Sequence, residues 1–276
     1  MERFVEVQGV RVPRFIYGTA WKEHRTEGLT RLALEVGFRG IDTANQRKHY
    51  FEAGVGAAIA AAGIARDELF LQTKFTDVRG QDHRLPYDLD ASVGRQVEQS
   101  FASSLKHLGV DHVDSYVLHG PESGRGWSAA DLQVWGAMER LHRERRARLL
   151  GVSNISRDQL LTLCGSATVA PALVQNRCYA RTGWDQEVRE VCRERGIVYQ
   201  GFSLLTANQR EVRGATVAAI ARRLGATIPQ VVFRFAFAVG MVALTGTSDR
   251  THMQQDLAAV DLAITESDVA ALERLR

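Results

Sequence analysis

Ionisable side chains of four types stand at or near the ends of short apolar segments of the chain. Asp42, Lys74 and His119 each close such a segment, and Tyr50 follows Asp42 in a polar loop. Carboxylate, ammonium, imidazole and phenol groups transfer protons and stabilise charge in catalytic sites. One polar residue at a strand end is equally typical of a turn or a helix cap. Ionisable residues at three successive segment ends, with the Ser-Asn pair 153–154 at the next, instead indicate a functional site.

The elements that would position these residues repeat along the chain. Each apolar, β-rich segment is followed by a polar loop and an amphipathic helical pattern. The eight segments cover 15–18, 38–42, 69–74, 113–119, 148–153, 172–175, 197–203 and 241–246. Because parallel strands need a crossover helix, the alternation predicts a parallel sheet. Eight such units are the count of a closed (β/α)8 barrel, whose active site lies at the carboxyl ends of the strands.

No low-complexity segment or Pro/Gly-rich linker divides the chain, so we predict one domain over residues 1–276. The start, "RFVEVQGVRVPRF", alternates around Gly9 and predicts a β-hairpin. A doubly wound open sheet is the alternative, but no G-x-G-x-x-G sequence follows the first strand, as a Rossmann site would require. The predicted fold is an α/β protein, a (β/α)8 TIM barrel with an N-terminal β-hairpin.

The composition argues against several classes of partner. Lys and Arg number 35 and Asp and Glu 32, which gives a net charge of +3 spread along the chain. The basic run at 140–150 has helical spacing and fits a solvated helix face better than a nucleic-acid patch. Three cysteines without CxxC spacing indicate neither a disulfide framework nor a zinc site. No secretory signal and no apolar run of about 18 residues occurs. We therefore expect a cytoplasmic protein without a membrane segment, monomeric or weakly homo-oligomeric.

Several ordered segments resemble the aldo-keto reductase superfamily along nearly the whole chain. They are "GTAWK" (18–22), "GFRGIDTA" (37–44), "EAGVGAAI" (52–59), "DELFLQTK" (67–74), "SLKHLGVDHVDSYVLHGP" (104–121), "GVSNIS" (151–156), "VQNRCY" (174–179) and "CRERGIVYQGFS" (192–203). The resemblance implies a (β/α)8 barrel that binds NADPH or NADH across the strand ends and reduces an aldehyde or ketone. Family members use an Asp, a Tyr, a Lys and a His, and three of these match Asp42, Lys74 and His119.

The implied reaction accounts for these residue types. A carbonyl carbon that accepts a hydride leaves negative charge on its oxygen, which must be stabilised and protonated. A phenol has an ordinary pKa of about 10, and a neighbouring ammonium such as Lys74 would lower that pKa. Asp42 would hold Lys74 protonated and oriented, and His119 would position the carbonyl by a hydrogen bond. The alternative is a structural Asp42–Lys74 ion pair beside a capping His119.

The phenol departs from the family spacing. Tyr-x-x-Glu is usual ahead of the second helix, and counting back three residues from Glu52 reaches His49. Tyr50 lies two residues before Glu52, in a loop longer than usual. We expect Tyr50 to be the catalytic acid, because its chemistry is required and a longer loop can absorb one residue. His49 is the alternative, although an imidazole near Lys74 would resist protonation.

Other residues match family positions that contact the nicotinamide. We expect Ser153, Asn154 and Gln175 to hydrogen-bond its carboxamide. Phe202 stands where an aromatic residue stacks under the nicotinamide ring.

Two loops match further cofactor contacts of the family. Ser203 and Leu205 begin the loop that is expected to cover the pyrophosphate. Gly18, Thr19 and Trp21 match the loop beside the nicotinamide and the substrate, with a core position as the alternative for Trp21.

The adenosine end is less regular. Many family members have Pro-Lys-Ser, then Arg and Asn, after the eighth strand, and their Lys and Arg hold the 2′-phosphate. In the run 244–257, Gly246, His252 and Asp256 stand at the Lys, Arg and Asn positions. Hydroxyl and backbone donors or a cation could still serve this end. The residues expected here are Gly246, Thr247, Ser248, Arg250 and His252. NADPH (NADP) is the preferred cofactor and NADH (NAD) the alternative.

The long loop 75–92 after the third strand is where such barrels place specificity, and we expect it to help select a small-molecule carbonyl substrate. An alternative function is a non-catalytic barrel that binds nicotinamide and regulates a partner. A metal-dependent hydrolase is disfavoured, because no His-x-His or carboxylate cluster stands at a strand end.

Overall fold

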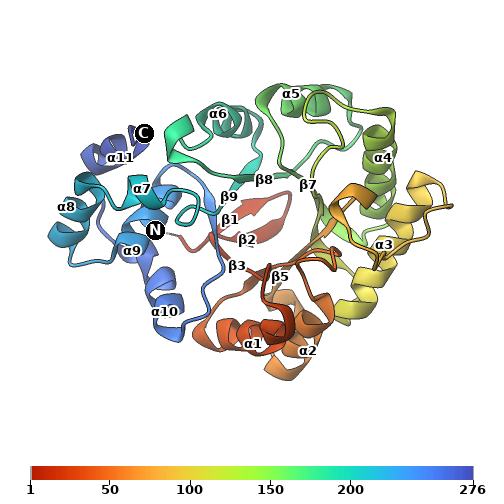
Figure 1. The fold of residues 1–276 in the computed structure, drawn as a ribbon, viewed down its shortest axis with the longest axis horizontal. Helices are drawn as coiled ribbons and strands as arrows, with labels where there is room; N and C mark the ends of the chain where they lie inside the picture. Colours follow the sequence, from red (N-terminus) through yellow and green to blue (C-terminus); the bar gives the residue numbers. More distant parts are fainter. Residues whose placement is uncertain (1, 276) are drawn as a thin grey trace.

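The computed structural model describes residues 2–275, and eight parallel strands form a closed barrel (Figure 1). The strands neighbour one another in the order β10-β3-β4-β5-β6-β7-β8-β9. Their bounds are β3 (Phe15–Gly18), β4 (Gly40–Asp42), β5 (Phe70–Phe75), β6 (Val113–Leu118), β7 (Ala147–Ser153), β8 (Leu173–Arg177), β9 (Val198–Phe202) and β10 (Val242–Thr245). The predicted TIM barrel is confirmed, and each strand overlaps one of the eight apolar segments.

The helices surround the barrel, as the ring of coils in Figure 1 shows. The α-helices are α1 (Thr26–Val36), α2 (Glu52–Ala62), α3 (Val93–Leu108), α4 (Ala129–Arg143), α5 (Arg157–Ser166), α6 (Gln186–Arg195), α7 (Gln209–Val212), α8 (Ala215–Leu224), α9 (Ile228–Ala238), α10 (Arg250–Ala258) and α11 (Glu266–Glu273). Short 3-10 turns are η1 (Glu23–Arg25), η2 (Arg66–Glu68), η3 (Val78–Gly80), η4 (Ala180–Thr182) and η5 (Ala259–Asp261). The helices within residues 2–275 are all too short or too polar to cross a membrane.

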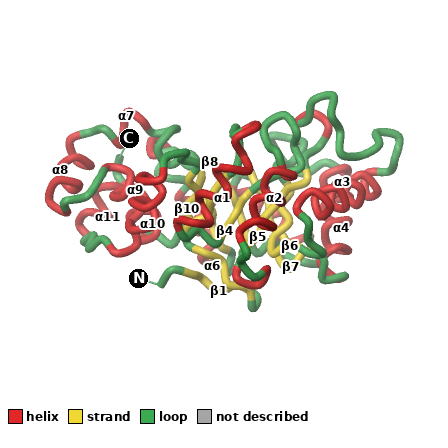
Figure 2. The backbone as a smooth tube through the Cα atoms, turned by 90° about the horizontal axis from the view of Figure 1, so that it is seen from below, coloured by secondary structure: helices red, strands yellow, loops and turns green. Residues whose placement is uncertain are grey.

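The predicted N-terminal hairpin is also confirmed. Strands β1 (Phe4–Val7) and β2 (Val10–Pro13) pair antiparallel. In Figure 1 the hairpin lies across the middle of the ring, and in the side view of Figure 2 β1 lies below the barrel strands. Val10 and Val12 pack in one buried cluster with Phe70 and Val242, which begin their strands. The hairpin therefore closes the amino end of the barrel and leaves the carboxyl end open.

Local sequence explains where several helices begin. Ser128, Ser156, Thr227 and Thr265 each accept a hydrogen bond from the backbone three residues later, and each forms a capping box. Such caps satisfy amide groups that have no partner within the helix. The four helices α4, α5, α9 and α11 are thereby fixed at their amino ends.

Candidate active site

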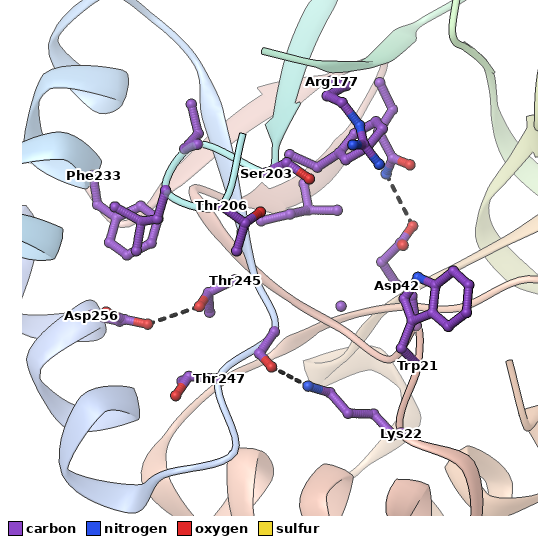
Figure 3. Close-up of a pocket in the computed structure, with 18 of the residues that line it drawn as sticks. Trp21, Lys22, Asp42, Arg177, Ser203, Thr206, Phe233, Thr245, Thr247 and Asp256 are labelled. Atoms are coloured by element: carbon purple, nitrogen blue, oxygen red, sulfur yellow. Dashed lines mark hydrogen bonds between the residues drawn. The ribbon is translucent and has the colours of Figure 1, made fainter. Parts of the chain in front are cut away.

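A cavity of about 770 Å³ lies at the carboxyl ends of the barrel strands, which is within the size range of ligand sites. Figure 3 shows Asp42 and Trp21 on one side of it and Asp256 on the other. The predicted site residues that line it are Gly18, Trp21, Asp42, Tyr50, His119, Ser153, Asn154, Gln175, Phe202, Ser203, Leu205, Gly246, Thr247 and His252. One cavity therefore holds most of the residues that the sequence singled out.

A buried ion pair between Lys74 and Asp42 lies beside the cavity. Lys74 Nζ lies 2.7 Å from both carboxylate oxygens of Asp42 and donates a third hydrogen bond, of 2.9 Å, to the Thr43 carbonyl. Lys74 is fully buried and lies behind Asp42, which itself reaches the cavity. Burial lowers the pKa of Lys74, and the charge of Asp42 opposes that shift. The ammonium is held by three acceptors in one orientation.

Two glutamines bind Asp42 inside the barrel, and a third glutamine binds both of them. Gln72 and Gln175 donate to Asp42 Oδ1 at 2.7 and 3.0 Å, and both also donate to Gln200 Oε1 at 2.9 Å. Bulky aliphatic residues usually fill such barrel layers. Gln72 and Gln200 were not expected in the site from the sequence, although a glutamine inside an otherwise apolar strand segment is a usable signal. This layer supplies additional hydrogen-bond donors to a buried carboxylate.

Tyr50 lies beside both the ion pair and His119. Lys74 Nζ is 5.3 Å from the centroid of the Tyr50 ring, and the Tyr50 and His119 ring centroids are 6.0 Å apart in an edge-on arrangement. Burial and the charge of Asp42 raise the pKa of Tyr50. This direction is opposite to the expected lowering by Lys74. The reason is that Asp42 compensates the Lys74 charge while the ring is withdrawn from water.

His119 is fixed at its backbone and at one ring nitrogen. Its amide donates to the Phe75 carbonyl at 2.9 Å, and its carbonyl accepts from Asn154 Nδ2 at 2.8 Å. Its Nδ1 lies 2.7 Å from Thr76 Oγ1. Burial, followed by the charges of Lys74 and His49, lowers the pKa of His119 to about 3. The imidazole is therefore neutral at physiological pH.

His49 lines the same cavity but packs on Trp21. The two ring centroids are 3.6 Å apart, and the Trp21 amide donates to the His49 carbonyl at 2.7 Å. Trp21 is 67% exposed, so the alternative of a core position for it is wrong. Burial and then Lys48 lower the pKa of His49. Of the two candidate acids, Tyr50 is the one whose ring lies against Lys74.

The start of α2 positions the loop that carries Tyr50. Glu52 accepts a hydrogen bond of 2.5 Å from Thr73 Oγ1 on β5, and its other oxygen lies 3.2 Å from His107 Nδ1 on α3. Gly56 lets α2 approach α3, because a Cβ there would lie 2.1 Å from the His107 carbonyl oxygen. Glu52 is buried and so anchors the end of the loop to the strand that carries Lys74.

The residues predicted for the nicotinamide end lie together. Asn154 Nδ2 donates to the Ser153 hydroxyl at 3.1 Å as well as to His119, and the Gln175 amide nitrogen is bound to Asp42 and Gln200. The Asn154 and Gln175 side-chain oxygens are thus the groups that can accept from a ligand amide. The Phe202 ring borders the cavity, with Arg177 Cζ at 5.5 Å from its centroid. Arg177 was not anticipated from the sequence.

The cavity also contains a buried cation, Lys22, that was not expected from the sequence. Lys22 Nζ donates to the Gly246 carbonyl, and Lys22 is 9% exposed. In Figure 3 Lys22 lies on the same side of the cavity as Trp21. Burial, with Arg25 second, lowers the pKa of Lys22. Asp256 accepts from Thr245 Oγ1 at 2.9 Å, and burial raises its pKa to about 7.

Three residues predicted to contact the cofactor do not line the cavity. Thr19 is buried and donates through its hydroxyl and its amide to the Asp42 carbonyl, at 2.9 and 3.0 Å. Ser248 is exposed, and Arg250 pairs with Glu35 on α1 at 2.6 Å. Thr19 therefore holds the backbone of Asp42 in place, and the Arg250 side chain forms an ion pair at the surface. Within residues 2–275, no group of three or more His, Cys, Asp or Glu could hold a metal ion.

Comparisons with known proteins agree with this geometry. The model of the "Aldo/keto reductase family" matches residues 18–276. An "Aldo-keto reductase" of Mycolicibacterium vanbaalenii is 32% identical over 245 residues, which cover 88% of this chain and 80% of the relative. A "Glyoxal reductase" of Bacillus subtilis is 27% identical over 271 residues, which cover 97% of this chain and 90% of the relative.

Solved structures give the same result. An aldo/keto reductase from Brucella melitensis superimposes with a TM-score of 0.83 at 26% identity, over 99% of this chain and all of that one (100%). MGS-M4, an aldo-keto reductase from a Medee basin deep-sea metagenome library, has a TM-score of 0.84 at 25% identity, over 97% of this chain and 93% of its own. With this fold, a polar cavity at the carboxyl ends of its strands and a family match over most of its length, the chain belongs to the aldo/keto reductase family.

Proposed function

We propose that the protein reduces an aldehyde or ketone to an alcohol, reversibly, with NADPH or NADH as the hydride donor. The observation that carries the proposal is the Tyr50 phenol, placed beside the buried Asp42–Lys74 pair and a neutral His119 in one cavity. Family membership supports carbonyl reduction in general, and one relative is named a glyoxal reductase. The identity of the carbonyl substrate is left open.

The groups that line the cavity fit a nicotinamide dinucleotide. The Asn154 and Gln175 side-chain oxygens and the Phe202 ring could hold the amide and the ring of the nicotinamide. Lys22 could hold a phosphate, because its hydrogen-bond partner is the backbone carbonyl of Gly246 rather than a carboxylate. We prefer NADPH, because its additional 2′-phosphate offers a further anion to the Lys22 ammonium and the Thr247 hydroxyl that line the cavity, with NADH as the alternative. A bound reduced nicotinamide would supply the hydride.

The side chains of this chain would handle the carbonyl oxygen. His119, neutral at physiological pH, would donate a hydrogen bond that orients the carbonyl without itself transferring a proton. Tyr50, whose pKa is raised by burial, stays protonated before the reaction and would give its proton as negative charge develops on the oxygen. Lys74 would then be the nearest cation to the phenolate and would stabilise it.

The test begins with cofactor binding and then turnover. Protein fluorescence would be followed during titration with NADPH and with NADH. A panel of aldehydes and ketones would then be screened for loss of reduced-nicotinamide absorbance. Tyr50→Phe should lower kcat by at least about 100-fold while it retains cofactor binding. His49→Ala should change kcat only a few-fold, because His49 packs on Trp21.

Two outcomes would contradict the proposal. A large loss in His49→Ala with activity kept in Tyr50→Phe would transfer the acid role to His49. Tight cofactor binding without turnover of any carbonyl would instead favour the alternative, a non-catalytic nicotinamide-binding regulatory barrel.

A further inference from the structure

Thr76 lies outside the cavity but contacts His119, which lines it. It follows directly after β5 and is buried. Its Oγ1 lies 2.7 Å from His119 Nδ1, a distance typical of a hydrogen bond. Because Nδ1 is engaged with this buried hydroxyl, Nε2 is the ring nitrogen left for a molecule in the cavity. The direction of the Thr76–His119 hydrogen bond then decides what Nε2 can offer.

Hydrogen-bond accounting determines that direction. A neutral imidazole carries one N–H, and the nitrogen that bears it is set by the hydrogen bond that the other nitrogen makes. If His119 Nδ1 donated to Thr76, the hydroxyl hydrogen of Thr76 would need another acceptor. Within residues 2–275 the Thr76 side chain has no hydrogen bond except the one to His119, so that hydrogen would have no partner. If Thr76 donates instead, its hydroxyl hydrogen and His119 Nδ1 are both satisfied, and the imidazole proton lies on Nε2, the nitrogen left for a molecule in the cavity. A buried polar hydrogen without a partner is costly, so the second arrangement is favoured.

The loop after β5 holds Thr76 in place. The Thr76 carbonyl accepts hydrogen bonds from Tyr87 Oη at 2.9 Å and from Gln81 Nε2 at 3.3 Å. Its methyl group packs so closely on Gly80 that a Cβ there would lie 2.5 Å from Thr76 Cγ2. The backbone and the side chain of Thr76 are both constrained, so its hydroxyl cannot easily leave His119. Residues 75–92 thus reach the candidate active site through this contact.

We propose that Thr76 is a positioning residue that donates its hydroxyl hydrogen to His119 Nδ1 and so keeps the imidazole proton on Nε2. This inference rests on the proposed function in one respect: Nε2–H would be the donor that orients a carbonyl oxygen. With the proton on Nδ1, Nε2 would present a lone pair to that oxygen, which would repel it. Thr76 itself would not touch the substrate.

The first test reads the proton position without any turnover. Protein labelled with ¹⁵N-histidine is observed by NMR at pH 7.5, and the His119 signals are assigned by their loss in His119→Gln. Wild type and Thr76→Ser should both show a protonated Nε2 and an unprotonated Nδ1. Thr76→Val, which lacks the donor, should show a shift of the tautomer population toward Nδ1–H. Thr30→Val is the matched control, because Thr30 is a buried threonine in α1 whose hydroxyl has no partner within residues 2–275.

The second test reads the consequence for catalysis. Thr76→Val should lower kcat about tenfold, which corresponds to about 1.4 kcal/mol, while the Kd for NADPH is unchanged. Thr76→Ser and Thr30→Val should keep the wild-type kcat. If no carbonyl is turned over but the NMR pattern is as expected, the proposed function fails while the assignment of Thr76 stands.

Three results would overturn the inference. The first is a wild-type His119 that carries its proton on Nδ1, which needs no variant to be seen. The second is a Thr76→Val protein with an unchanged tautomer. The third is a Thr76→Ser protein that resembles Thr76→Val in both measurements.

Discussion

Replacing Asp42 with asparagine should make the stability of the protein increase with pH relative to wild type. Asp42 accepts hydrogen bonds from Lys74, Gln72 and Gln175 in the barrel interior. Burial lowers the pKa of Lys74, and Asp42 opposes this. Without the carboxylate, only the charge of Glu52 opposes the effect of burial, so the pKa of Lys74 in the folded variant falls further below its ordinary value. The unfolded chain holds the same group charged, with an ordinary pKa of about 10.4.

The magnitude follows from the protons bound in each state. Below pH of about 10 the unfolded Asp42→Asn chain binds more protons than the folded one, so the free energy of unfolding increases with pH, by at most about 1.4 kcal/mol per pH unit. Between pH 7 and 9 the gain is therefore at most about 2.7 kcal/mol. Lys74→Met leaves a buried carboxylate without its cation, and the expected loss of stability at these pH values is about 3–5 kcal/mol.

Urea unfolding followed by circular dichroism at pH 7, 8 and 9 would measure both effects. Asp261→Asn is the control, because Asp261 pairs with Arg3 at 3.0 Å while their side chains are 64% and 58% exposed. Such a pair contributes little, so this variant should stay within about 0.5 kcal/mol of wild type at each pH. An Asp42→Asn protein whose free energy of unfolding changes with pH in parallel with wild type would contradict this prediction. So would a Lys74→Met protein that loses less than about 1 kcal/mol of unfolding free energy.

Two further predictions concern Asp256 and Lys22, which both line the cavity. Burial raises the pKa of Asp256 to about 7, so the folded wild type should lose stability as pH rises from about 4 to about 7, whereas Asp256→Asn should not. Thermal unfolding measured from pH 4 to pH 7 should show that the free energy of unfolding of Asp256→Asn rises by roughly 2–4 kcal/mol relative to that of wild type. The Asp67→Asn control should show the same pH dependence of stability as wild type. Lys22→Met should raise the Kd for NADPH about tenfold without lowering kcat. Fluorescence titration would measure this Kd, with Lys106→Met, a change at an exposed lysine, as the control. Equal NADPH affinities of Lys22→Met and wild type would show that Lys22 contacts no phosphate.

The barrel could be predicted because local patterns determine it. Asp42, Lys74 and His119 end up near one another because parallel strands with crossover helices bring their carboxyl ends to one face. That inference needs only the alternation of segments and no knowledge of side-chain packing. The buried glutamines were harder to anticipate, because Gln72 meets Gln200, a residue 128 positions away. A polar residue inside a strand signals that a partner exists but does not identify it.

The path of the loop before α2 could not be read from residue spacing. The His49 carbonyl is bound by the amide of Trp21 from a different loop, and Glu52 is tied to Thr73 on β5. These long-range contacts turn His49 toward Trp21 and leave Tyr50 beside Lys74. Counting back three residues from Glu52 selects His49 rather than Tyr50. The count does not place these side chains, because tertiary contacts at both ends of the loop set its conformation.

Burial shifts three ionisable groups at the proposed reaction centre, Tyr50, His119 and Lys74, toward their uncharged forms. It raises the pKa of Tyr50 and lowers those of His119 and Lys74. Before a reaction the phenol and the imidazole are therefore both neutral hydrogen-bond donors, and the charge of Lys74 is matched by Asp42. Negative charge that appears on a carbonyl oxygen would be the unbalanced charge in this region, where little water competes for it. In the proposed reaction, a weakly acidic phenol would transfer its proton there, because the developing alkoxide is a stronger base than phenolate. The proposed site would thus bind the transition state of reduction more strongly than the neutral carbonyl substrate or the alcohol product.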